Sequence, residues 1–418
     1  MSSKNLQETF IFLLPDSSPM KYIILLGDGM ADYSLDELGG RTPLEAAKKP
    51  NIDALAKRSV GGYLRTIPKG MGPGSDVANL SILGYDPRIY YTGRGPLEAV
   101  SIGVKLEKGE MAFRCNLITQ RNGAIADYSA GHISTEEAEE LIQALDDHFD
   151  LGRFYGGVSY RNLFVTQSIP DIETTPPHDV IGGKIRDNLV RPADDLRVAS
   201  LNKMIIDSKD VLEDLPINLR RKKEGKNPAN MIWLWGQGVA PSMEPFHEKH
   251  GIRGAVISAV DLIKGIGIYA GMEIIEVPNS TGLIDTNWEG KADHAIKALE
   301  KVDLVYLHVE AIDEASHAGD AKMKVAAIEE FDRRLVGRLL ENLDFECTIA
   351  LLPDHYTPIS IKTHSQDPVP YIISAPKNKS DGLKSYSERE VKENGSLGIR
   401  EGHEFLKMFL EGNSTSFA

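Results

Sequence analysis

Short apolar runs alternate with stretches that favour helices over much of this 418-residue chain. The first run is "KYIILL", Lys21 to Leu26, and it ends at Gly27-Asp28-Gly29. A continuous apolar strand is typical of a sheet buried on both faces, which usually has parallel strands covered by helices. The pattern returns in the second half, where the runs are "ANMIWLWGQG", "KVDLVYLHVE", "ECTIALLPDH" and "VPYIISA". Strands that alternate with helices predict an α/β fold with a doubly wound, mostly parallel sheet.

The pattern changes between about residues 88 and 227. A helix candidate, "STEEAEELIQALDDHF", opens with a serine or threonine cap and has glutamates in its first turn. A strand candidate, "RNLFVTQ", and a proline- and glycine-rich loop, "TTPPHDVIGG", follow it. Because α/β-type strands flank this block on both sides, we predict that it is a smaller α+β domain inserted into the first. The predicted organisation is a leader at 1–20, a discontinuous metal-binding domain at 21–87 and 228–418, and an inserted substrate-binding domain at 88–227.

Length and composition narrow the class of protein. A chain of 418 residues is too long for one ordinary core and fits two domains, and its formal net charge of −14 argues against partners such as nucleic acid or a membrane surface. Two cysteines, Cys115 and Cys347, are too few for a disulfide framework and indicate a reducing compartment. The apolar run from Phe10 to Leu14 is shorter than a signal sequence or a membrane span requires. We therefore expect a cytoplasmic protein.

Metal-capable side chains follow three of the predicted strands. In an open α/β sheet, ligands bind beyond the carboxyl ends of the strands. Residues four apart, as in "DEASH", share one face of a helix. A lone histidine is more often structural, but three strand ends here supply three carboxylates and three imidazoles, enough for two divalent ions if one more oxygen completes the set. The candidates are Asp28, Asp313, His317, Asp354, His355 and His364.

Ser75 is the candidate for the missing oxygen ligand. It follows the turn-forming "GMGPG" and precedes the helix-compatible "DVANLSIL". Backbone N–H groups at the start of a helix favour an anionic oxygen or a phosphate. A neighbouring metal ion would lower the pKa of the hydroxyl and make it a nucleophile at neutral pH. The alternative is an ordinary N-cap serine with no chemical role.

Five motifs occur in a fixed order along the chain: "GDGMAD", "PGSDVANLSILGYDP", "DEASHAGD", "PDHYTP" and "THSQDPVP". Together they resemble the cofactor-independent (2,3-bisphosphoglycerate-independent) phosphoglycerate mutases of the archaeal-type branch, within the alkaline phosphatase superfamily. "AGHISTEEAEELI" and "INLRRKKEGKNPAN" extend the resemblance to nearly the whole chain after about Lys21. It implies an alkaline-phosphatase-like domain with an inserted substrate-binding domain. It also implies a glycolytic isomerase that interconverts 3-phosphoglycerate and 2-phosphoglycerate through a phosphoserine.

The resemblance further implies roles for individual residues. Ser75 would carry the phosphoryl group, and Lys264 would lie near it. Two divalent metal ions would be bound, with Mn²⁺ favoured over Mg²⁺ or Zn²⁺. One ion would be held by Asp313, His317 and His364, and the other by Asp28, Ser75, Asp354 and His355. The small phosphorylated-acid substrate would be held by Asp127, Arg161, Arg220 and Arg221.

The chain departs from the archaeal pattern around the expected substrate site. Tyr128 and Ser129 replace a basic pair, His132 stands where those proteins have another basic residue, and Trp235 falls where an arginine is often found. The departures leave alternatives open: a homoserine kinase-like phosphotransferase, a metal-dependent phosphatase that uses the same serine and metals, or a catalytically silent metal-binding protein. The sequence is compatible with a monomer or a homo-oligomer.

Overall fold

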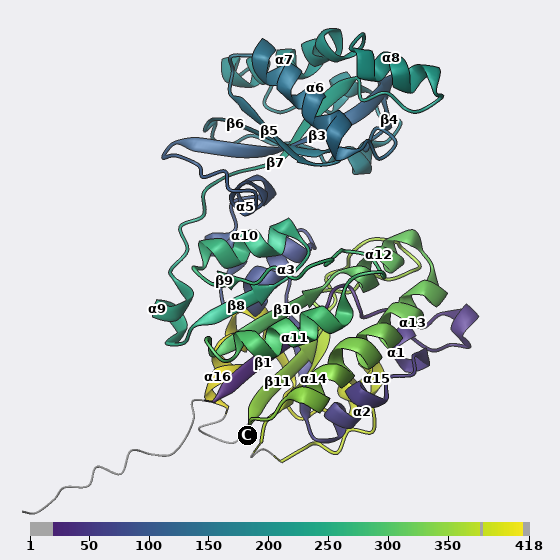
Figure 1. Ribbon diagram of the computed structural model, residues 1–418, viewed down its shortest axis with the longest axis vertical. Coiled ribbons are helices and arrows are strands. Elements are labelled where there is room, and N and C mark those ends of the chain that lie inside the picture. Colours follow the sequence, from purple (N-terminus) through teal and green to yellow (C-terminus); the bar gives the residue numbers. More distant parts are fainter. Residues whose placement is uncertain (1–19, 377–378, 413–418) are drawn as a thin grey trace, which may run out of the picture.

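The computed structural model describes residues 20–376 and 379–412, which form two units, one above the other in Figure 1. The leader predicted at residues 1–20 lies outside this part of the chain except for Met20. The larger unit is built on an eight-stranded sheet and the smaller unit on a five-stranded sheet. Within the two described ranges, no helix is both long enough and apolar enough to cross a bilayer.

The large sheet is mostly parallel, as predicted. Its central strand β1 (Lys21–Gly27) pairs in parallel with β10 on one side and with β11 on the other. The exception is β12, which runs antiparallel to both β11 and β2. In spatial order the strands are β13 (Ile399–Glu401), β2 (Val60–Arg65), β12 (Val369–Ser374), β11 (Cys347–Leu352), β1, β10 (Leu304–Val309), β8 (Gly254–Ile257) and β9 (Glu273–Ile274).

Helices cover both faces of this sheet, which explains why its strands are apolar throughout. Ile23 and Leu25 of β1 point into one core, and Ile24 and Leu26 point into the other. The first core includes residues of α1 (Pro43–Ala46), α2 (Pro50–Lys57), α11 (Trp288–Ala298), α12 (Ala311–Ala318), α13 (Ala321–Glu330), α14 (Gly337–Asn342) and α15 (Glu388–Asn394). The second includes residues of α3 (Ser75–Ile82), α4 (Pro87–Tyr90), α5 (Arg94–Ser101), α9 (Phe246–His250), α10 (Asp261–Tyr269) and α16 (Phe405–Glu411).

A π-helical turn, η4 (Phe331–Val336), joins α13 to α14. Asp332 in this turn is buried, and its carboxylate accepts a 2.7 Å hydrogen bond from the backbone N–H of Ile52. Ile52 lies in the first turn of α2, whose N–H groups have no partner within the helix. The carboxylate therefore accepts a hydrogen bond from the first turn of α2 and joins this helix to the turn between α13 and α14.

The small unit is antiparallel throughout. Its longest strand, β3 (Glu110–Arg121), pairs with β4 (Ala124–Asp127), β6 (Arg161–Gln167) and β7 (Met231–Val239), and β6 pairs with β5 (Arg153–Val158). Helices α6 (Thr135–His148), α7 (Leu196–Leu212) and α8 (Pro216–Lys223) share a separate core with this sheet. Short 3₁₀ turns complete both units: η1 (Asp36–Leu38), η2 (Pro177–Val180), η3 (Ile185–Asp187) and η5 (Gly402–Glu404).

Strand β7 corrects one expectation. The run "ANMIWLWGQG" was predicted to belong to the large parallel sheet, and that prediction is wrong, because β7 pairs antiparallel with β3. Its first five residues are all buried, since β7 packs against α7 and also against α5, which lies between the two units (Figure 1). A strand covered on both sides is apolar throughout in either kind of sheet. We propose that the inserted unit extends from about residue 88 to about 239 rather than ending at 227.

Candidate active site

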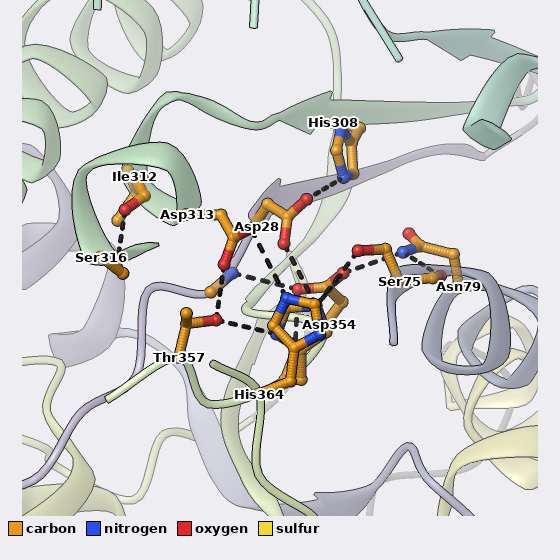
Figure 2. Close-up of polar contacts among 12 residues, drawn as sticks. Asp28, Ser75, Asn79, His308, Ile312, Asp313, Ser316, Asp354, Thr357 and His364 are labelled. Carbon is orange, nitrogen blue, oxygen red and sulfur yellow. Dashed lines mark hydrogen bonds and ion pairs between the residues drawn. The ribbon is translucent and has the colours of Figure 1, made fainter. Parts of the chain in front are cut away.

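The carboxyl ends of three neighbouring strands meet at one point of the large sheet. Asp28 follows β1, helix α12 follows β10, and the pair Asp354-His355 follows β11. Because β11, β1 and β10 are adjacent in the sheet, their loops converge, and α3 brings Ser75 to the same place (Figure 2). The sequence could place each residue at a strand end. The adjacency of these three strands is what brings the residues together.

Asp313, His317 and His364 form a first group of converging atoms. Nε2 of His317 lies 3.0 Å from Oδ2 of Asp313 and 3.0 Å from Nε2 of His364, and Nε2 of His364 lies 3.7 Å from the same Oδ2. Asp313 and His317 are one turn apart on α12, as their spacing predicted. Nδ1 of His317 lies 3.0 Å from the carbonyl oxygen of Lys362. A carbonyl can only accept, so Nδ1 carries a proton, and in the neutral ring the lone pair of Nε2 faces the group.

Asp28, Ser75, Asp354 and His355 form a second group. Nε2 of His355 lies 3.1 Å from Oγ of Ser75 and 3.4 Å from both Oδ1 of Asp28 and Oδ2 of Asp354. Both carboxylates and the imidazole are at most 2% exposed. Oδ1 of Asp28 accepts no hydrogen bond from any residue that the structure describes. A buried carboxylate oxygen without a donor is costly unless a cation satisfies it.

The two groups suit divalent ions. Nitrogen and oxygen ligands lie about 2.0–2.2 Å from such an ion, which puts neighbouring ligand atoms in a tetrahedral shell about 3.3–3.6 Å apart. The distances within the two groups, from 3.0 Å between His317 and Asp313 to 3.7 Å between His364 and Asp313, lie on both sides of that spacing. Two sets of donor atoms lie within 4.8 Å of one another: those of Asp313, His355 and His364, and those of Asp28, Asp354 and His355. His355 appears in both sets because its ring centroid lies 3.9 Å from that of His364. All seven predicted ligands therefore lie in one cluster.

Burial dominates the electrostatics of the cluster. Burial raises the pKa of Asp28 well above 3.8, and the charges of Asp354 and Asp313 raise it further. Burial also raises the pKa of Asp354 and lowers the pKa of His355 well below 6.5. Burial acts to raise the pKa of Asp313 too, but hydrogen bonds and charges from His317 and His364 hold it well below its ordinary value. Cations within the cluster would favour the ionised form of every carboxylate.

Ser75 is not a helix cap. The N-cap of α3 is Gly74, Ser75 is the first helical residue, and no side chain caps this end of the helix. The hydroxyl is instead directed at His355, so the ordinary N-cap alternative does not describe it. Asn79, one turn later on α3, donates to the carbonyl oxygen of Ser75 at 2.7 Å and to Oδ2 of Asp354 at 2.9 Å. It fixes the serine relative to the carboxylate.

Three supporting residues escaped the sequence analysis: Asn79, His308 and Thr357. Nε2 of His308 lies 3.0 Å from Oδ2 of Asp28, and its Nδ1 lies 3.3 Å from the hydroxyl of Ser258. Asn79 could have been found from its position four residues after Ser75, and Thr357 from its place in "PDHYTP". His308 lies inside the apolar run of β10, where no local signal distinguishes it from a core residue.

Lys264 lies apart from the cluster. It is on α10, and its Nζ donates to the two carboxylate oxygens of Glu276 at 2.9 and 3.0 Å. Its side chain is only 16% exposed. The structure places it at an ion pair outside the cluster. Within the described part of the chain, no hydrogen bond or ion pair joins Lys264 to Ser75, so its predicted catalytic role has no geometric support.

A cleft of about 580 Å³ separates the two units beside the cluster. Arg161, at the start of β6, and His132 line it from the small unit. Glu310 and Glu314 line it from the large unit, and burial raises the pKa of Glu310 to about 8. Arg161 is exposed, so its guanidinium is available to a ligand in the cleft. The contact of Arg161 with substrate stays a prediction.

Two of the predicted substrate-binding residues, Arg220 and Arg221, contact other groups of the small unit. Arg221 is 3% exposed and donates to the carbonyl oxygens of Asn227 at 2.9 Å and Ala130 at 2.6 Å, and also to Glu137. Arg220 pairs with the same glutamate at 3.0 Å. These guanidinium groups are already engaged, so the geometry supports a structural role in place of the predicted substrate contacts.

The carboxylate of Asp127 holds the turn that leads to His132. It accepts from the backbone N–H groups of Ser129 at 2.8 Å and Gly131 at 2.6 Å, and from Nδ2 of Asn227 at 2.8 Å. His132 has a φ of +50°, in the left-handed region that few non-glycine residues adopt. Asp127 therefore positions a cleft residue, and its own predicted contact with substrate has no support.

Two arginines outside the predicted set lie beside Trp235. Arg114 of β3 stacks 4.3 Å above the ring of Trp235, and Arg94 of α5 lies 5.9 Å from the same ring. Nε of Arg94 is also 3.5 Å from the carboxylate of Asp76, the residue after Ser75. Trp235, which replaces an expected arginine, thus supports two cations contributed by other elements. Nothing in the local sequence links these distant positions.

The fold and the cluster define an α/β enzyme with a buried carboxylate–histidine site around a serine, faced by a second unit across a cleft. A family model described as 2,3-bisphosphoglycerate-independent phosphoglycerate mutase matches residues 56–218. 2,3-Bisphosphoglycerate-independent phosphoglycerate mutase 2 of Methanothermobacter thermautotrophicus is 54% identical over 94% of this chain and 98% of its own length. A probable enzyme of this name from Geobacter sulfurreducens is 48% identical over 94% of this chain and 100% of its own.

Solved structures agree with these relatives. A protein from Pyrococcus horikoshii has a TM-score of 0.80 and 31% identity, covering 94% of this chain and 97% of its own. A cofactor-independent phosphoglycerate mutase from Thermoplasma acidophilum has a TM-score of 0.63 and 28% identity, covering 94% of this chain and 99% of its own. The chain belongs to the family of 2,3-bisphosphoglycerate-independent phosphoglycerate mutases. The resemblance seen in the sequence motifs and the expected α/β fold with a second, smaller unit are both confirmed.

Proposed function

We propose that the protein interconverts 3-phosphoglycerate and 2-phosphoglycerate through a phosphoserine at Ser75, without added bisphosphoglycerate. The observation that carries this proposal is the position of the Ser75 hydroxyl. It lies at the start of α3, 3.1 Å from Nε2 of His355, among the buried carboxylates of Asp28 and Asp354. A structural metal site has no need of a serine held in this way.

The reaction has two half-steps at one hydroxyl. In the first, the bond between phosphorus and the 3-oxygen of the substrate breaks as phosphorus bonds to Oγ of Ser75; the hydroxyl of Ser75 loses its proton and the released 3-oxygen gains one. In the second, the 2-oxygen of the retained glycerate loses its proton as it bonds to phosphorus, and the released Oγ of Ser75 regains one. Both steps depend mainly on positioning and charge stabilisation. Asn79 holds the serine for both steps through its bond to the Ser75 carbonyl oxygen.

We propose that Asp313, His317 and His364 bind one divalent ion and that Asp28, Ser75, Asp354 and His355 bind the other. Two bound ions would lower the pKa of the serine hydroxyl and neutralise charge on the phosphoryl oxygens. One ligand group is rich in oxygen and the other in imidazole nitrogen. Mg²⁺ prefers oxygen ligands, whereas Mn²⁺ and Zn²⁺ accept both kinds. Of these two we favour Mn²⁺, as the family resemblance implies.

A substrate with a carboxylate and a phosphate needs cations in an acidic protein. We propose that Arg161 across the cleft and Arg94 beside Asp76 supply them, with Arg114 stacked behind on Trp235. Guanidinium groups bind carboxylates and phosphates through two parallel hydrogen bonds. These arginines offset the basic pair that Tyr128 and Ser129 replace. The anion-binding capacity therefore supports phosphoglycerate over an uncharged or zwitterionic alcohol.

The proposed reaction is a step of glycolysis and gluconeogenesis, and we place the protein in the cytoplasm. Cys115 and Cys347 are both free thiols, which agrees with a reducing compartment.

The test supplies the purified protein and Mn²⁺ with three reaction mixtures followed by ³¹P NMR. The first contains 3-phosphoglycerate alone, the second homoserine and ATP, and the third 2-phosphoglycerate with analysis for free phosphate. We expect the 2-phosphoglycerate resonance to grow in the first mixture. Reaction of the second mixture alone would replace the mutase with a kinase-like phosphotransferase. Release of inorganic phosphate without isomerisation would replace it with a phosphatase.

A further inference from the structure

Thr357 lies between the two groups of candidate metal ligands. Its hydroxyl oxygen Oγ1 is 2.5 Å from Oδ1 of Asp313, in the first group, and 3.1 Å from Nδ1 of His355, in the second (Figure 2). The side chain is fully buried, so no water competes for either contact. One hydroxyl thus contacts a ligand of each proposed ion.

The single proton of this hydroxyl can serve only one of the two neighbours. The carboxylate of Asp313 is an acceptor, and it is the nearer partner, so the hydroxyl donates to Oδ1. The hydroxyl oxygen must then accept from His355, which requires that Nδ1 of His355 carry a proton. The lone pair of Nε2 is consequently directed toward Ser75, Asp28 and Asp354.

The contact between Thr357 and Asp313 also involves one particular oxygen atom. Thr357 engages Oδ1 of Asp313, whereas His317 and His364 lie nearest Oδ2. The hydroxyl therefore sets the rotation of the carboxylate and turns Oδ2 toward the two imidazoles. Metal-binding histidines and carboxylates are commonly oriented by hydrogen bonds of this kind from residues that do not touch the metal.

Gly29 leaves room for this arrangement. It has a φ of +59°, and a Cβ at this position would lie 2.5 Å from Oγ1 of Thr357 and collide with Oδ1 of Asp313. The glycine of "GDG" is therefore required both by its left-handed backbone and by the hydroxyl–carboxylate contact.

The backbone of Thr357 is held independently of its side chain. Its carbonyl oxygen accepts from Nζ of Lys324 at 3.0 Å, and its N–H group lies 3.4 Å from the carbonyl oxygen of Ala31. Replacing the hydroxyl by a methyl group leaves these contacts in place. Thr357→Val is consequently a local change of nearly constant volume.

We infer that Thr357 is a positioning residue that couples the two metal sites, because one hydroxyl fixes both the tautomer of His355 and the rotation of Asp313. This inference rests on the proposed metal-dependent function. It predicts that loss of the hydroxyl weakens both ions together, although Thr357 touches neither.

The test compares wild type, Thr357→Val and Thr357→Ser by calorimetric titration of Mn²⁺ into the chelator-treated full chain. We expect two ions to bind the wild type. In Thr357→Val, the affinity for each of the two Mn²⁺ ions should fall by about 10–100-fold, as it does when other contacts of this kind are lost. Thr357→Ser keeps the hydroxyl, so its affinities should stay within about threefold of wild type. Undiminished binding by Thr357→Val, or weakening of one ion alone, would overturn the coupling. A wild type that binds no Mn²⁺ would instead overturn the proposed function.

A second measurement needs no variant at Thr357. In metal-free protein labelled with ¹⁵N-histidine, the nitrogen shifts of His355, assigned with a His355→Gln variant, report which ring nitrogen carries the proton. We expect the Nδ1–H form. The Nε2–H form in the wild type would overturn the inference even if Thr357→Val failed to fold.

Discussion

Lys324 and Asp32 form an ion pair in the interior of the large unit, and removing the lysine should destabilise the protein strongly. Both side chains are fully buried, and Nζ of Lys324 lies 2.8 Å from Oδ2 of Asp32. Nζ also donates to the carbonyl oxygens of Ala31 at 3.3 Å and Thr357 at 3.0 Å. The lysine therefore joins the loop after β1, which carries Asp28, to the loop after β11, which carries His355.

The expected magnitude follows from what Lys324→Met leaves behind. Methionine keeps most of the volume, so the cavity contribution is small. The carboxylate of Asp32 keeps its backbone donors, the N–H groups of Tyr33 and Ile359, but loses its buried counter-charge. Breaking a buried pair in this way costs about 3–5 kcal/mol, a large part of the 5–15 kcal/mol that stabilises a typical protein. The carbonyl oxygens of Ala31 and Thr357 also lose the lysine as a donor, although that of Ala31 keeps the N–H of Thr357.

Urea unfolding of the metal-free protein at pH 7, followed by circular dichroism, measures the effect. The matched control is Lys322→Met, because Lys322 is exposed on the same helix and should change the free energy of unfolding by no more than about 0.5 kcal/mol. The double variant Asp32→Asn/Lys324→Met removes the buried charge and should recover part of the loss. A loss of less than about 1 kcal/mol in Lys324→Met alone would refute the argument that this pair holds the two loops together.

Three further predictions concern the site and its pH dependence. Ser75→Ala should abolish isomerisation and ³²P incorporation from labelled substrate, whereas Ser81→Ala, at a buried serine of the same helix, should leave both in place; turnover in Ser75→Ala would rule out the phosphoserine. Chelation should remove activity and lower the melting temperature, and Mn²⁺ should restore both; full activity after exhaustive chelation would exclude the metal site. Burial raises the pKa of Glu388 from 4.5 to about 7. Between these two pH values the folded protein holds a proton that the unfolded chain has lost, so the free energy of unfolding should fall as pH rises. Glu388→Gln should remove about 3 kcal/mol of this fall in the free energy of unfolding. If urea titrations between these pH values show the same pH dependence in Glu388→Gln as in wild type, Glu388 is not the group responsible.

The local sequence was sufficient to predict most strands of the large unit and the residue types of its candidate site. Apolar runs such as Lys21–Gly27 predicted strands because a parallel strand is buried on both faces, and Asp28 could be assigned to a strand end for the same reason. The spacing of Asp313 and His317 predicted one helical face, which α12 provides. Positions after predicted strands gathered six candidate ligands with Ser75, and the family motifs then divided these seven between two proposed ions.

The sequence could not decide the outcome where it depended on which element became the neighbour. Strand β7 has the same apolar run as a parallel strand, and only its pairing with β3 assigns it to the small unit. Arg221 belongs to a basic run that could equally have faced solvent or substrate, yet its contacts with Glu137 and Ala130 bury it. Lys264 is engaged by Glu276, from a different segment of the chain.

The sequence by itself determined the kind of chemistry available: serine, carboxylate and imidazole side chains at the ends of apolar strands. Only the tertiary structure decided how these groups meet, because strand order in the sheet, and not distance along the chain, brings the ends of β11, β1 and β10 together. It also decided the supporting contacts. Whether a hydroxyl such as that of Thr357 lies between two ligands depends on distances of a few ångströms between segments more than forty residues apart.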